Sequence, residues 1–492
     1  MEVVRVGRPV AISVVCRLLL VLLLTLPGLL PRLARAQSPT ITARNPVRNA
    51  RSGLRAGPVA VTFSQNMGAA SASNLKVFGF QAGGKKAGTY STATNTITFA
   101  ATVPFRAGER VDVTVPATVQ SATGAAATKQ VYQFTAATAN STGNFVSNST
   151  ATAGNNPSYL ATGDLDGDGD LDLAITNGDN SSGNSSSTVS IRLNTGLNSG
   201  TYAGGSEVPV GKNPGGVVLG DVDNDGDLDL LVINTNSIMV NVRLNTGNGT
   251  FVNGTDVAKI QGFDLTLGDV DADGDLDLVT ASFGAIAVRL NNGSGVFDAT
   301  VTNDLPAGTA TYGVALGDID GDGDLDLVAS DGDNNLVRVY SNNGSGSFTA
   351  TATISAYSAY NAVALADTDG DGDLDLLVNE FFNYATEIFT NSGVNSGSFV
   401  STSTRVSASN YPSYLAVGDV NSDGTLDLLI TNSIGTVSVA LNTAGTFGTP
   451  VQYSNGGTSP NNIALGDVNG DGTLDFVLPN SNALAGAAGV AI

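Results

Sequence analysis

A ten-residue acidic phrase occurs seven times in the chain, and its spacing restricts the fold more than any other feature. The copies begin at Asp164, Asp221, Asp269, Asp318, Asp367, Asp419 and Asp467. Successive starts are 57, 48, 49, 49, 52 and 48 residues apart. This is the spacing of a four-stranded blade, and it is too long for the coil of a nonapeptide β-helix. Seven units therefore predict a seven-bladed β-propeller.

The strands of one unit can be placed directly from the sequence. In the fourth unit, short apolar runs at 313–316, 325–329, 336–340 and 348–354 are separated by the acidic phrase and by Gly and Asn turns. The whole chain contains 60 Gly and only three Met, which fits short strands joined by many turns. We therefore expect an all-β protein.

The phase of the repeat suggests how the ring closes. Residues 143–146 match the start of a fourth strand, such as 249–252, but they precede the first acidic phrase. The last unit ends at 490–492, which matches a third strand. We expect the N-terminal segment to supply the missing outer strand of the last blade, leaving no open sheet edge. Loss of C-terminal residues is the alternative explanation.

Residues 1–36 have the pattern of a secretory signal peptide. Arg5, Arg8 and Arg17 give a basic start, an apolar run follows at 18–30, and 34–36 is a small-x-small cleavage site. A run of about 13 apolar residues is shorter than the ~20 needed to span a bilayer. We expect a secreted or cell-surface protein that begins near Gln37 and has no membrane span after cleavage.

Cleavage changes the composition of the chain. The only cysteine, Cys16, is removed, so no disulfide can stiffen the fold. The mature chain keeps 17 basic and 43 acidic residues, a net charge of −26. This charge disfavours nucleic acid as a partner. We expect bound metal to stiffen the fold in place of disulfides. We also expect the protein to be a monomer.

Residues 37–138 contain no acidic phrase and predict a separate domain. Alternating strands at 59–63, 96–99, 110–115 and 131–134 fit a small β-sandwich of the Ig-like type. The runs 62–67, 94–99 and 107–110 resemble the bacterial Ig-like domain of S-layer (SbsA-like) type. The resemblance implies a spacer or adhesion module, and a spacer without a ligand is the simpler interpretation. The propeller then takes residues 139–492.

The acidic phrases have the pattern of calcium loops. Ca²⁺ takes six to eight oxygen ligands, and carboxylates at alternate positions with Gly at the sixth can wrap around it. We expect the seventh residue to offer its backbone carbonyl and the ninth to close the shell. In the last two loops Asn replaces the third Asp and Thr stands seventh, so those sites should bind with lower affinity. The expected ligands of about seven Ca²⁺ are Asp164, Asp166, Asp168, Asp170 and Asp172; Asp221, Asp223, Asp225, Asp227 and Asp229; Asp269, Asp271, Asp273, Asp275 and Asp277; Asp318, Asp320, Asp322, Asp324 and Asp326; Asp367, Asp369, Asp371, Asp373 and Asp375; Asp419, Asn421, Asp423, Thr425 and Asp427; Asp467, Asn469, Asp471, Thr473 and Asp475.

The acidic phrases have two other possible interpretations. An EF-hand would need flanking helices and a Glu at position twelve, whereas apolar or Thr residues stand near that point here. Acidic turns without metal would place 31 Asp at the odd positions of the seven loops, and such crowding of like charges destabilises a fold. Structural calcium is the interpretation that the pattern favours.

With the acidic loop and the period established, the repeats resemble the FG-GAP or VCBS repeats of bacterial surface proteins, which are related to integrin α-subunit propellers. The resemblance covers residues 140–492, although the Phe-Gly and Gly-Ala-Pro signatures are poorly preserved. It implies calcium loops on one face, a binding or adhesion role, and ligands held by other loops.

The sequence offers little to support an enzyme. No His is present, which excludes Ser-His-Asp and Cys-His systems and His-ligated zinc. Glu380 and Glu387 flank an aromatic insertion and form the one carboxylate pair to consider for glycoside hydrolysis; no catalytic residue is assigned.

Three functions follow in order of preference. Adhesion to a polysaccharide or a surface protein comes first, an architectural envelope component second, and a polysaccharide-degrading enzyme third.

Loops that vary between units are the candidate ligand sites, while a recurring Phe should be core. The loops are 178–187, 331–335 and 380–384, and the recurring positions are Phe251, Phe297, Phe348, Phe399 and Phe447.

Overall fold

The computed structural model describes most of the chain after residue 36. It describes residues 37–81, 84–146, 150–178, 187–196, 200–299, 304–307, 310–356, 359–391, 397–454, 460–480 and 489–491. The predicted signal peptide, residues 1–36, lies outside the described residues. Residues Pro39–Ile492 form one compact unit.

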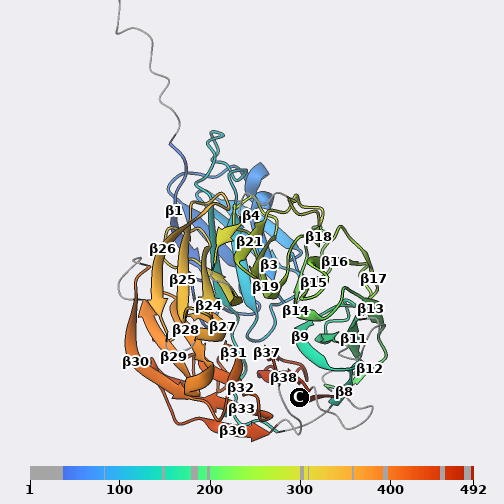
Figure 1. Cartoon of the computed structure of the whole chain (residues 1–492). Coiled ribbons are helices and arrows are strands. Elements are labelled where there is room, and N and C mark those ends of the chain that lie inside the picture. The colour runs from blue at the N-terminus through green and yellow to red at the C-terminus, as the bar shows by residue number, and fades with distance from the viewer. Residues whose placement is uncertain are drawn as a thin grey trace, which may run out of the picture. The chain divides into compact units, whose positions relative to one another are not determined.

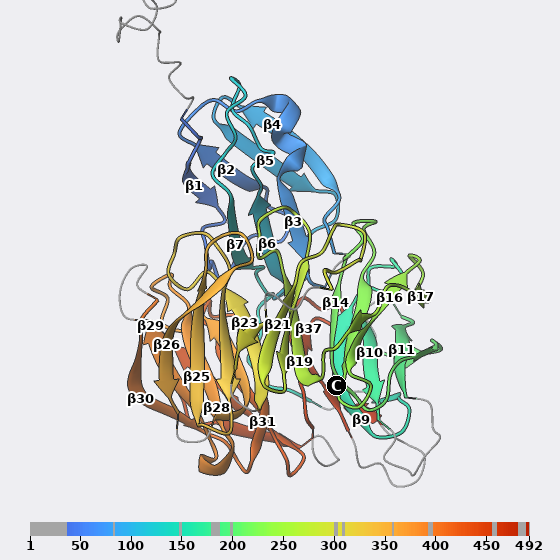
Figure 2. The same cartoon turned by 45° about the horizontal axis from the view of Figure 1, so that its top comes forward.

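The N-terminal domain is a sandwich of two antiparallel sheets (Figure 2). A single core cluster that includes Phe63, Phe99, Val113 and Phe134 fills the space between them. The four predicted strands are confirmed as β2, β5, β6 and β7. One sheet has the order β1 (Ile41–Asn45), β2 (Val59–Phe63), β5 (Thr96–Ala101) and β4 (Gly88–Ala93), and the other β3 (Lys76–Gly79), β6 (Arg110–Val115) and β7 (Gln130–Thr135), with a 3-10 helix, η1 (Ala69–Asn74), after β2.

Seven antiparallel sheets follow, arranged around a common centre (Figure 1). In the first six sheets the strands run outward in chain order, as expected for propeller blades, whereas the outermost strand of the seventh is β8 (Thr150–Thr152). The first three blades contain β9 (Pro157–Gly163), β10 (Asp172–Asn177), β11 (Thr188–Asn194), β12 (Tyr202–Ala203) and β13 (Glu207–Pro209); β14 (Pro214–Gly220), β15 (Asp229–Asn234), β16 (Met239–Asn245), β17 (Phe251–Asn253) and β18 (Val257–Ala258); and β19 (Gly262–Gly268), β20 (Asp277–Ser282), β21 (Ala285–Arg289) and β22 (Leu305–Pro306).

The remaining blades repeat this order. The fourth blade confirms the four strands that the sequence predicted for it. These blades contain β23 (Thr311–Gly317), β24 (Asp326–Asp331), β25 (Leu336–Asn342) and β26 (Phe348–Ser355); β27 (Ala359–Ala366), β28 (Asp375–Glu380), β29 (Ala385–Asn391) and β30 (Phe399–Ser407), with a 3-10 helix, η3 (Phe381–Asn383); β31 (Pro412–Gly418), β32 (Asp427–Asn432), β33 (Thr436–Ala440) and β36 (Val451–Ser454), with the hairpin β34 (Asn442–Thr443) and β35 (Thr446–Phe447); and β37 (Ala464–Gly466), β38 (Asp475–Pro479), β39 (Gly489–Ala491) and β8 (Thr150–Thr152).

The second strand of a blade is buried at every position from β10 through β32, because each blade is covered on both faces by its neighbours. The apolar clusters accordingly lie between blades. One of them joins Leu231 and Val242 of the second blade to Leu267 and Leu278 of the third. Burial on both faces explains why these strands read as continuous apolar runs rather than alternating ones.

The ring closes through the segment that the phase of the repeat predicted. β8 pairs antiparallel with β39, with Ala151 opposite Val490. At the other side of the blade, β37 contacts both β31 and β9, so the innermost strands form a complete circle. Phe145, within the predicted segment, packs against Tyr453 and Phe476, while the paired strand itself lies a few residues later.

The prediction that the recurring phenylalanines are core residues holds in part, since all five contact inter-blade clusters but only one is buried. Phe297 is buried, whereas Phe251, Phe348, Phe399 and Phe447 are half-buried at the margins of their clusters. Among the described residues, no helix is long and apolar enough to cross a membrane.

Candidate metal centres

Each acidic phrase forms a loop between the first and second strands of a blade. Strands flank every loop, which contradicts the EF-hand alternative. The sixth residue is Gly in all seven loops, and its φ lies between 85° and 103°, the left-handed region that favours glycine. The sequence-based role of this Gly in turning the chain is therefore confirmed.

The acidic side chains support the loop with main-chain hydrogen bonds. In the first loop, the third-position carboxylate of Asp166 accepts from the N–H of Asp168 at 3.1 Å, and Asp168 accepts from the N–H of Asp170 at 2.9 Å. The same two bonds recur in the sixth loop, where Asn421 takes the place of the third Asp. These bonds direct the odd-numbered side chains toward one region, as wrapping around a cation requires.

The ninth-position Asp has a second role that the sequence did not reveal. In the second loop one oxygen of Asp229 accepts from the N–H of Val222 at 2.9 Å, and the other accepts from the N–H of Asn245 at 2.8 Å. The equivalent pair of bonds forms in the first loop around Asp172. A carboxylate oxygen has two acceptor sites, so the ninth Asp can tie the loop to the third strand and still face a cation.

A repeated Asn at the end of the third strand completes this arrangement. The side-chain amide of Asn245 donates to the carbonyl of Leu228 in its own loop at 3.1 Å, and to that of Leu165 in the preceding blade's loop at 2.9 Å. Asn291 and Asn342 make the same pair of bonds. Consecutive loops are thereby joined. The equivalents are Asn194, Asn391 and Asn442.

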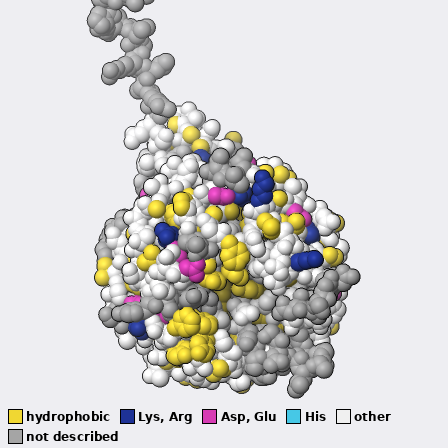
Figure 3. Space-filling model, in the orientation of Figure 1, with side chains coloured by type: hydrophobic (Ala, Val, Ile, Leu, Met, Phe, Trp, Pro, Cys, Tyr) yellow, Lys and Arg dark blue, Asp and Glu magenta, His cyan; other side chains and the backbone are white. Residues whose placement is uncertain are grey.

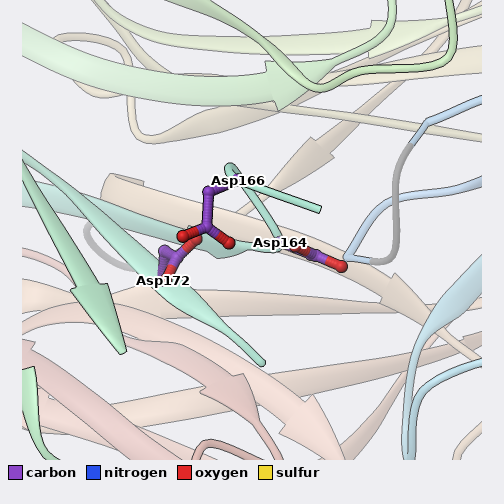
Figure 4. A group of neighbouring side chains, drawn as sticks. All are labelled: Asp164, Asp166 and Asp172. Carbon is purple, nitrogen blue, oxygen red and sulfur yellow. The ribbon is translucent and has the colours of Figure 1, made fainter. Parts of the chain in front are cut away.

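Five loops bring three carboxylates together closely enough to hold one metal ion. In each group one oxygen per residue lies within 4.8 Å of the others. Figure 4 shows the first group, with the carboxylates of Asp166 and Asp172 next to each other and Asp164 beside them. The groups are Asp164, Asp166 and Asp172; Asp221, Asp223 and Asp225; Asp269, Asp271 and Asp273; Asp318, Asp320 and Asp326; and Asp367, Asp369 and Asp371.

The sixth and seventh loops keep the same main-chain geometry with fewer charges. Among the described residues they form no group of three carboxylates, because Asn421 and Asn469 replace an acid. An amide oxygen is still a ligand that Ca²⁺ accepts. The weaker pair of sites that the sequence predicted has this structural basis, and their occupancy stays a prediction.

Burial makes the carboxylates costly in their charged form. It raises the pKa of Asp172 and Asp326 to about 7, and that of Asp229 and Asp269 to about 8. Withdrawal from water penalises the anion, and neighbouring carboxylates add to this effect. A cation held among them would remove both penalties.

Orphaned oxygens support the presence of a cation. One buried carboxylate oxygen of Asp221, of Asp318 and of Asp467 finds no hydrogen-bond partner among the described residues. All three residues are the first of their loop. A buried acceptor without a partner costs about 1–3 kcal/mol, so hard oxygen donors left unpaired at one repeated position fit Ca²⁺.

The carboxylate pair considered for glycoside hydrolysis has another partner. Glu380 and Glu387 lie on neighbouring strands β28 and β29, and both are buried. Arg405 of β30 pairs with both of them, and Ser401 donates to Glu387 at 2.9 Å. The arrangement is that of an internal ion pair within a sheet, which does not favour a catalytic role.

The candidate ligand loops differ in what the structure describes. Most of 178–187 lies outside the described residues. In the loop 331–335, Asp331 forms an ion pair with Arg338 at 2.7 Å. In the loop 380–384, Phe382 and Tyr384 are exposed, and Tyr384 packs against Tyr411 with ring centroids 5.0 Å apart.

Family comparisons agree with the loop pattern. A model described as FG-GAP-like repeat matches residues 221–280, 269–329, 326–378 and 419–478, and an FG-GAP repeat model matches residues 158–191. A model of a bacterial Ig-like domain matches residues 35–136. The chain is an FG-GAP repeat protein with an N-terminal bacterial Ig-like domain. No curated protein sequence matches it.

Solved structures resemble this FG-GAP protein in fold. BBS1N in complex with ARL6DN has a TM-score of 0.50 and 13% identity, over 72% of this chain and 97% of that chain. A periplasmic gluconolactonase, PpgL, of Pseudomonas aeruginosa has a TM-score of 0.45 and 14% identity, over 82% and 99%. A lectin of Agrocybe aegerita that recognises non-reducing terminal N-acetylglucosamine has a TM-score of 0.42 and 18% identity, over 86% and 98%. At these identities the likeness concerns the fold alone.

Proposed function

We propose that the protein is a secreted or cell-surface binding protein whose propeller is held together by about seven Ca²⁺ ions, and that its ligand is a polysaccharide or a surface protein. The observation that carries the proposal is the unpaired, buried first-position oxygen of Asp221 and of Asp318, in two loops that also gather three carboxylates. The signal-peptide pattern and the bacterial Ig-like domain support an extracellular location.

Calcium would serve the structure rather than a reaction. When bound, it would supply positive charge that offsets the repulsion among the loop carboxylates, which main-chain hydrogen bonds hold close to one another. The first, third and fifth side chains and the ninth Asp would hold it, with the seventh residue offering its carbonyl. The ion pair of Glu380 and Glu387 with Arg405 argues for binding without catalysis.

Calcium binding is tested by changing one loop. Asp221→Asn removes one charge at a first position, and we expect equilibrium dialysis to find one calcium fewer per chain at a concentration that saturates the wild type. Asp333→Asn, an exposed acid outside the loops, is the matched control and should keep the wild-type number. The proposal would be refuted if the wild type held the same amount of calcium per chain after chelation as it does when calcium is supplied.

The binding role is tested separately. The calcium-loaded mature protein should retain a polysaccharide or a surface protein in a pull-down and on a glycan array, and it should release no reducing sugar from any polysaccharide it binds. Turnover of a bound polysaccharide would favour the enzyme alternative. Retention of no ligand would favour an architectural component.

A further inference from the structure

A cavity lies at the end of the propeller ring away from the acidic loops. It encloses about 570 Å³ and is lined at the first residues of the innermost strands β9, β14, β23 and β31. The acidic loops follow the last residues of these same strands. The cavity therefore opens at the opposite mouth of the central channel.

Aromatic rings form part of the cavity wall. Phe263 and Tyr312 stack with centroids 5.0 Å apart at 17°, and Tyr159 and Tyr414 meet edge to face at 6.4 Å. All four rings are half-buried, so each has a solvent-accessible part. Figure 3 shows hydrophobic side chains gathered in two groups on this view of the molecule, one of them beside the middle of the ring.

The rest of the wall is polar and uncharged. Asn156 and Asn461 are exposed at the rim, and Ser158 and Ser413 lie half-buried further in. Among the described lining residues there is no acid and no base. Amide and hydroxyl groups beside aromatic rings suit a ligand that carries many hydroxyls and has apolar faces.

We infer that the mouth of the channel binds a neutral carbohydrate, whose sugar rings rest on the aromatic side chains while Asn156 and Asn461 bond to its hydroxyl groups. This inference rests on the proposed binding function and names its site and ligand class. An anionic polysaccharide is disfavoured because the mature chain, with a net charge of −26, keeps about −12 even with seven Ca²⁺ bound. Of the loops that the sequence suggested, 178–187 reaches the cavity through Gly178, and the other lining residues lie outside all three loops.

The test compares two aromatic clusters on the calcium-loaded protein. A neutral oligosaccharide that binds on an array is titrated by calorimetry against Tyr312→Ala and against Phe382→Ala, an exposed ring of the insertion after β28. We expect Tyr312→Ala to weaken binding about tenfold or more, and Phe382→Ala to leave it unchanged. Asn461→Ala should weaken it as well, with less effect on packing.

Each other outcome would overturn the inference. Loss of binding with Phe382→Ala alone would place the site in the insertion. Failure of every neutral oligosaccharide would refute a carbohydrate site, while normal calcium uptake and capture of a surface protein would leave the proposed function standing. Melting curves and calcium uptake of the variants show whether each is folded.

A second observation concerns the other face of the ring. The Ig-like domain (residues 37–138) and Ala139, which follows it, contact all seven acidic loops. The contacts are Gln81 to Asp164, Lys85 to Asp221, Lys129 to Asp271, Arg48 to Asp318, Asn49 to Gly372, Thr138 to Asp419 and Ala139 to Gly472.

Most of these contacts depend on the shape of the loop. The N–H of Val131 donates to the carbonyl of Gly323 at 2.7 Å, and that of Ala139 donates to Gly472 at 2.6 Å. Lys129 donates to the carbonyl of Asp271 at 2.7 Å. Such bonds form only when the loop carbonyls stand in their folded positions.

Two of the first-position carboxylates, those of Asp318 and Asp221, offer one oxygen to the Ig-like domain and leave the other for a cation. One oxygen of Asp318 accepts from Arg48 at 2.9 Å and the other is among the orphaned oxygens. Asp221 likewise uses one oxygen for the N–H of Lys85 at 3.2 Å and leaves the other without a partner. Arg48 extends to the next loop as well, where it meets Asp373 at 3.1 Å.

We propose that the calcium loops are the docking surface of the Ig-like domain, so that loading the loops with calcium fixes this domain on the ring. Without cations the loop carboxylates repel one another. The loop carbonyls then leave the positions in which they accept from the N–H groups of Val131 and Ala139. By linkage, docking must strengthen calcium binding by the same factor. The proposal rests on calcium binding, which the Asp221→Asn experiment tests on its own.

Hydrogen exchange of the full mature chain tests this coupling. Chelation should lower the protection of the Val131 and Ala139 amides at least about tenfold, while the Phe63 amide, bonded to Asn95 inside the sandwich at 2.8 Å, stays protected. Arg48→Ala combined with Lys129→Ala should lower the protection of the same two amides even when calcium is bound. Arg338→Ala, whose ion pair stays within one blade, is the control.

Two outcomes would overturn the docking proposal. One is unchanged protection of Val131 and Ala139 in a chelated protein that has lost its calcium. The other is equal loss of protection at Phe63, which would indicate unfolding of the sandwich instead of its release.

Discussion

At the scale of single residues, the repeated Asn at the end of the third strand is the least expected contributor. Its amide bonds to two loop carbonyls, one of them in the preceding blade, and its own N–H bonds to the ninth-position Asp. The residue thus holds together parts of the chain that a sequence repeat shows only as separate units. The sequence shows this Asn in six of the seven units, but no motif assigns it a structural role.

Replacing this amide should destabilise the ring. In Asn245→Ala the carbonyl of Leu228 loses the donor that Asn245 gives it, at a cost of about 1–3 kcal/mol for such a buried group. The carbonyl of Leu165 keeps only the N–H of Gly249. We expect a lower midpoint in urea unfolding at saturating calcium. Asn253→Ala, at an exposed position of β17, should leave the midpoint unchanged, and an equal effect of both substitutions would contradict this account.

A buried acid in the channel predicts a pH dependence. Burial raises the pKa of Asp264 to about 7 from an ordinary value of 3.8. The stability that this group contributes is complete below pH 3.8 and is lost as pH rises through about 7, at most roughly 4 kcal/mol. The titratable groups that face it, Tyr159 and Tyr414, have their own pKa raised and stay neutral.

Asp264→Asn should remove this dependence. At saturating calcium we expect the variant to be more stable than the wild type at pH 8, and the difference to shrink at pH 5. Denaturant unfolding at both pH values measures it. A difference that does not change with pH would show that Asp264 is already protonated, or ion-paired, at pH 8.

At the scale of elements, the strand that closes the ring is short. β8 has three residues, and the middle one, Ala151, is buried while its neighbours are exposed. The phase of the repeat predicted that a segment before the first acidic phrase completes the last blade. It placed that segment a few residues early, because an outer strand in this fold is divided, as in β17 and β18.

A matched pair of substitutions tests ring closure. Ala151→Asp places a charge in the cluster between the first and last blades and should cost about 3 kcal/mol or more. Thr150→Asp, one residue earlier and exposed, should cost less than about 0.5 kcal/mol. Thermal melting at saturating calcium compares them, and deletion of residues 141–152 should lower the melting temperature at least as far as Ala151→Asp.

The sequence predicted regular elements well and contacts between distant elements poorly. Periods of two and of about 49 residues are local signals, so the fourth blade and strands β2 and β6 were placed almost to the residue. The docking of Arg48 on Asp318 and the approach of Tyr159 to Tyr414 arise only when the ring is closed, and no local pattern encodes them. The orphaned oxygen of Asp221 is likewise a consequence of burial.

At the scale of the whole molecule, calcium should dominate stability. If each of seven sites is filled to ten times its dissociation constant, each contributes roughly 1.4 kcal/mol, or roughly 10 kcal/mol together, which is comparable with the stability of a whole domain. We expect a chelator to lower the melting temperature of the mature protein strongly and millimolar calcium to restore it. Magnesium at the same concentration should restore less, because it tolerates only near-octahedral geometry.

The pairing of β8 with β39 also has a consequence for synthesis. Ribosomes make β8 before any blade and β39 after nearly all of them, so the last sheet stays incomplete until the final part of the chain has emerged. A product that stops early exposes an unpaired strand edge and an open apolar surface to proteases. The pairing of β8 with β39 therefore leaves the last blade incomplete in any product that lacks residues 489–491.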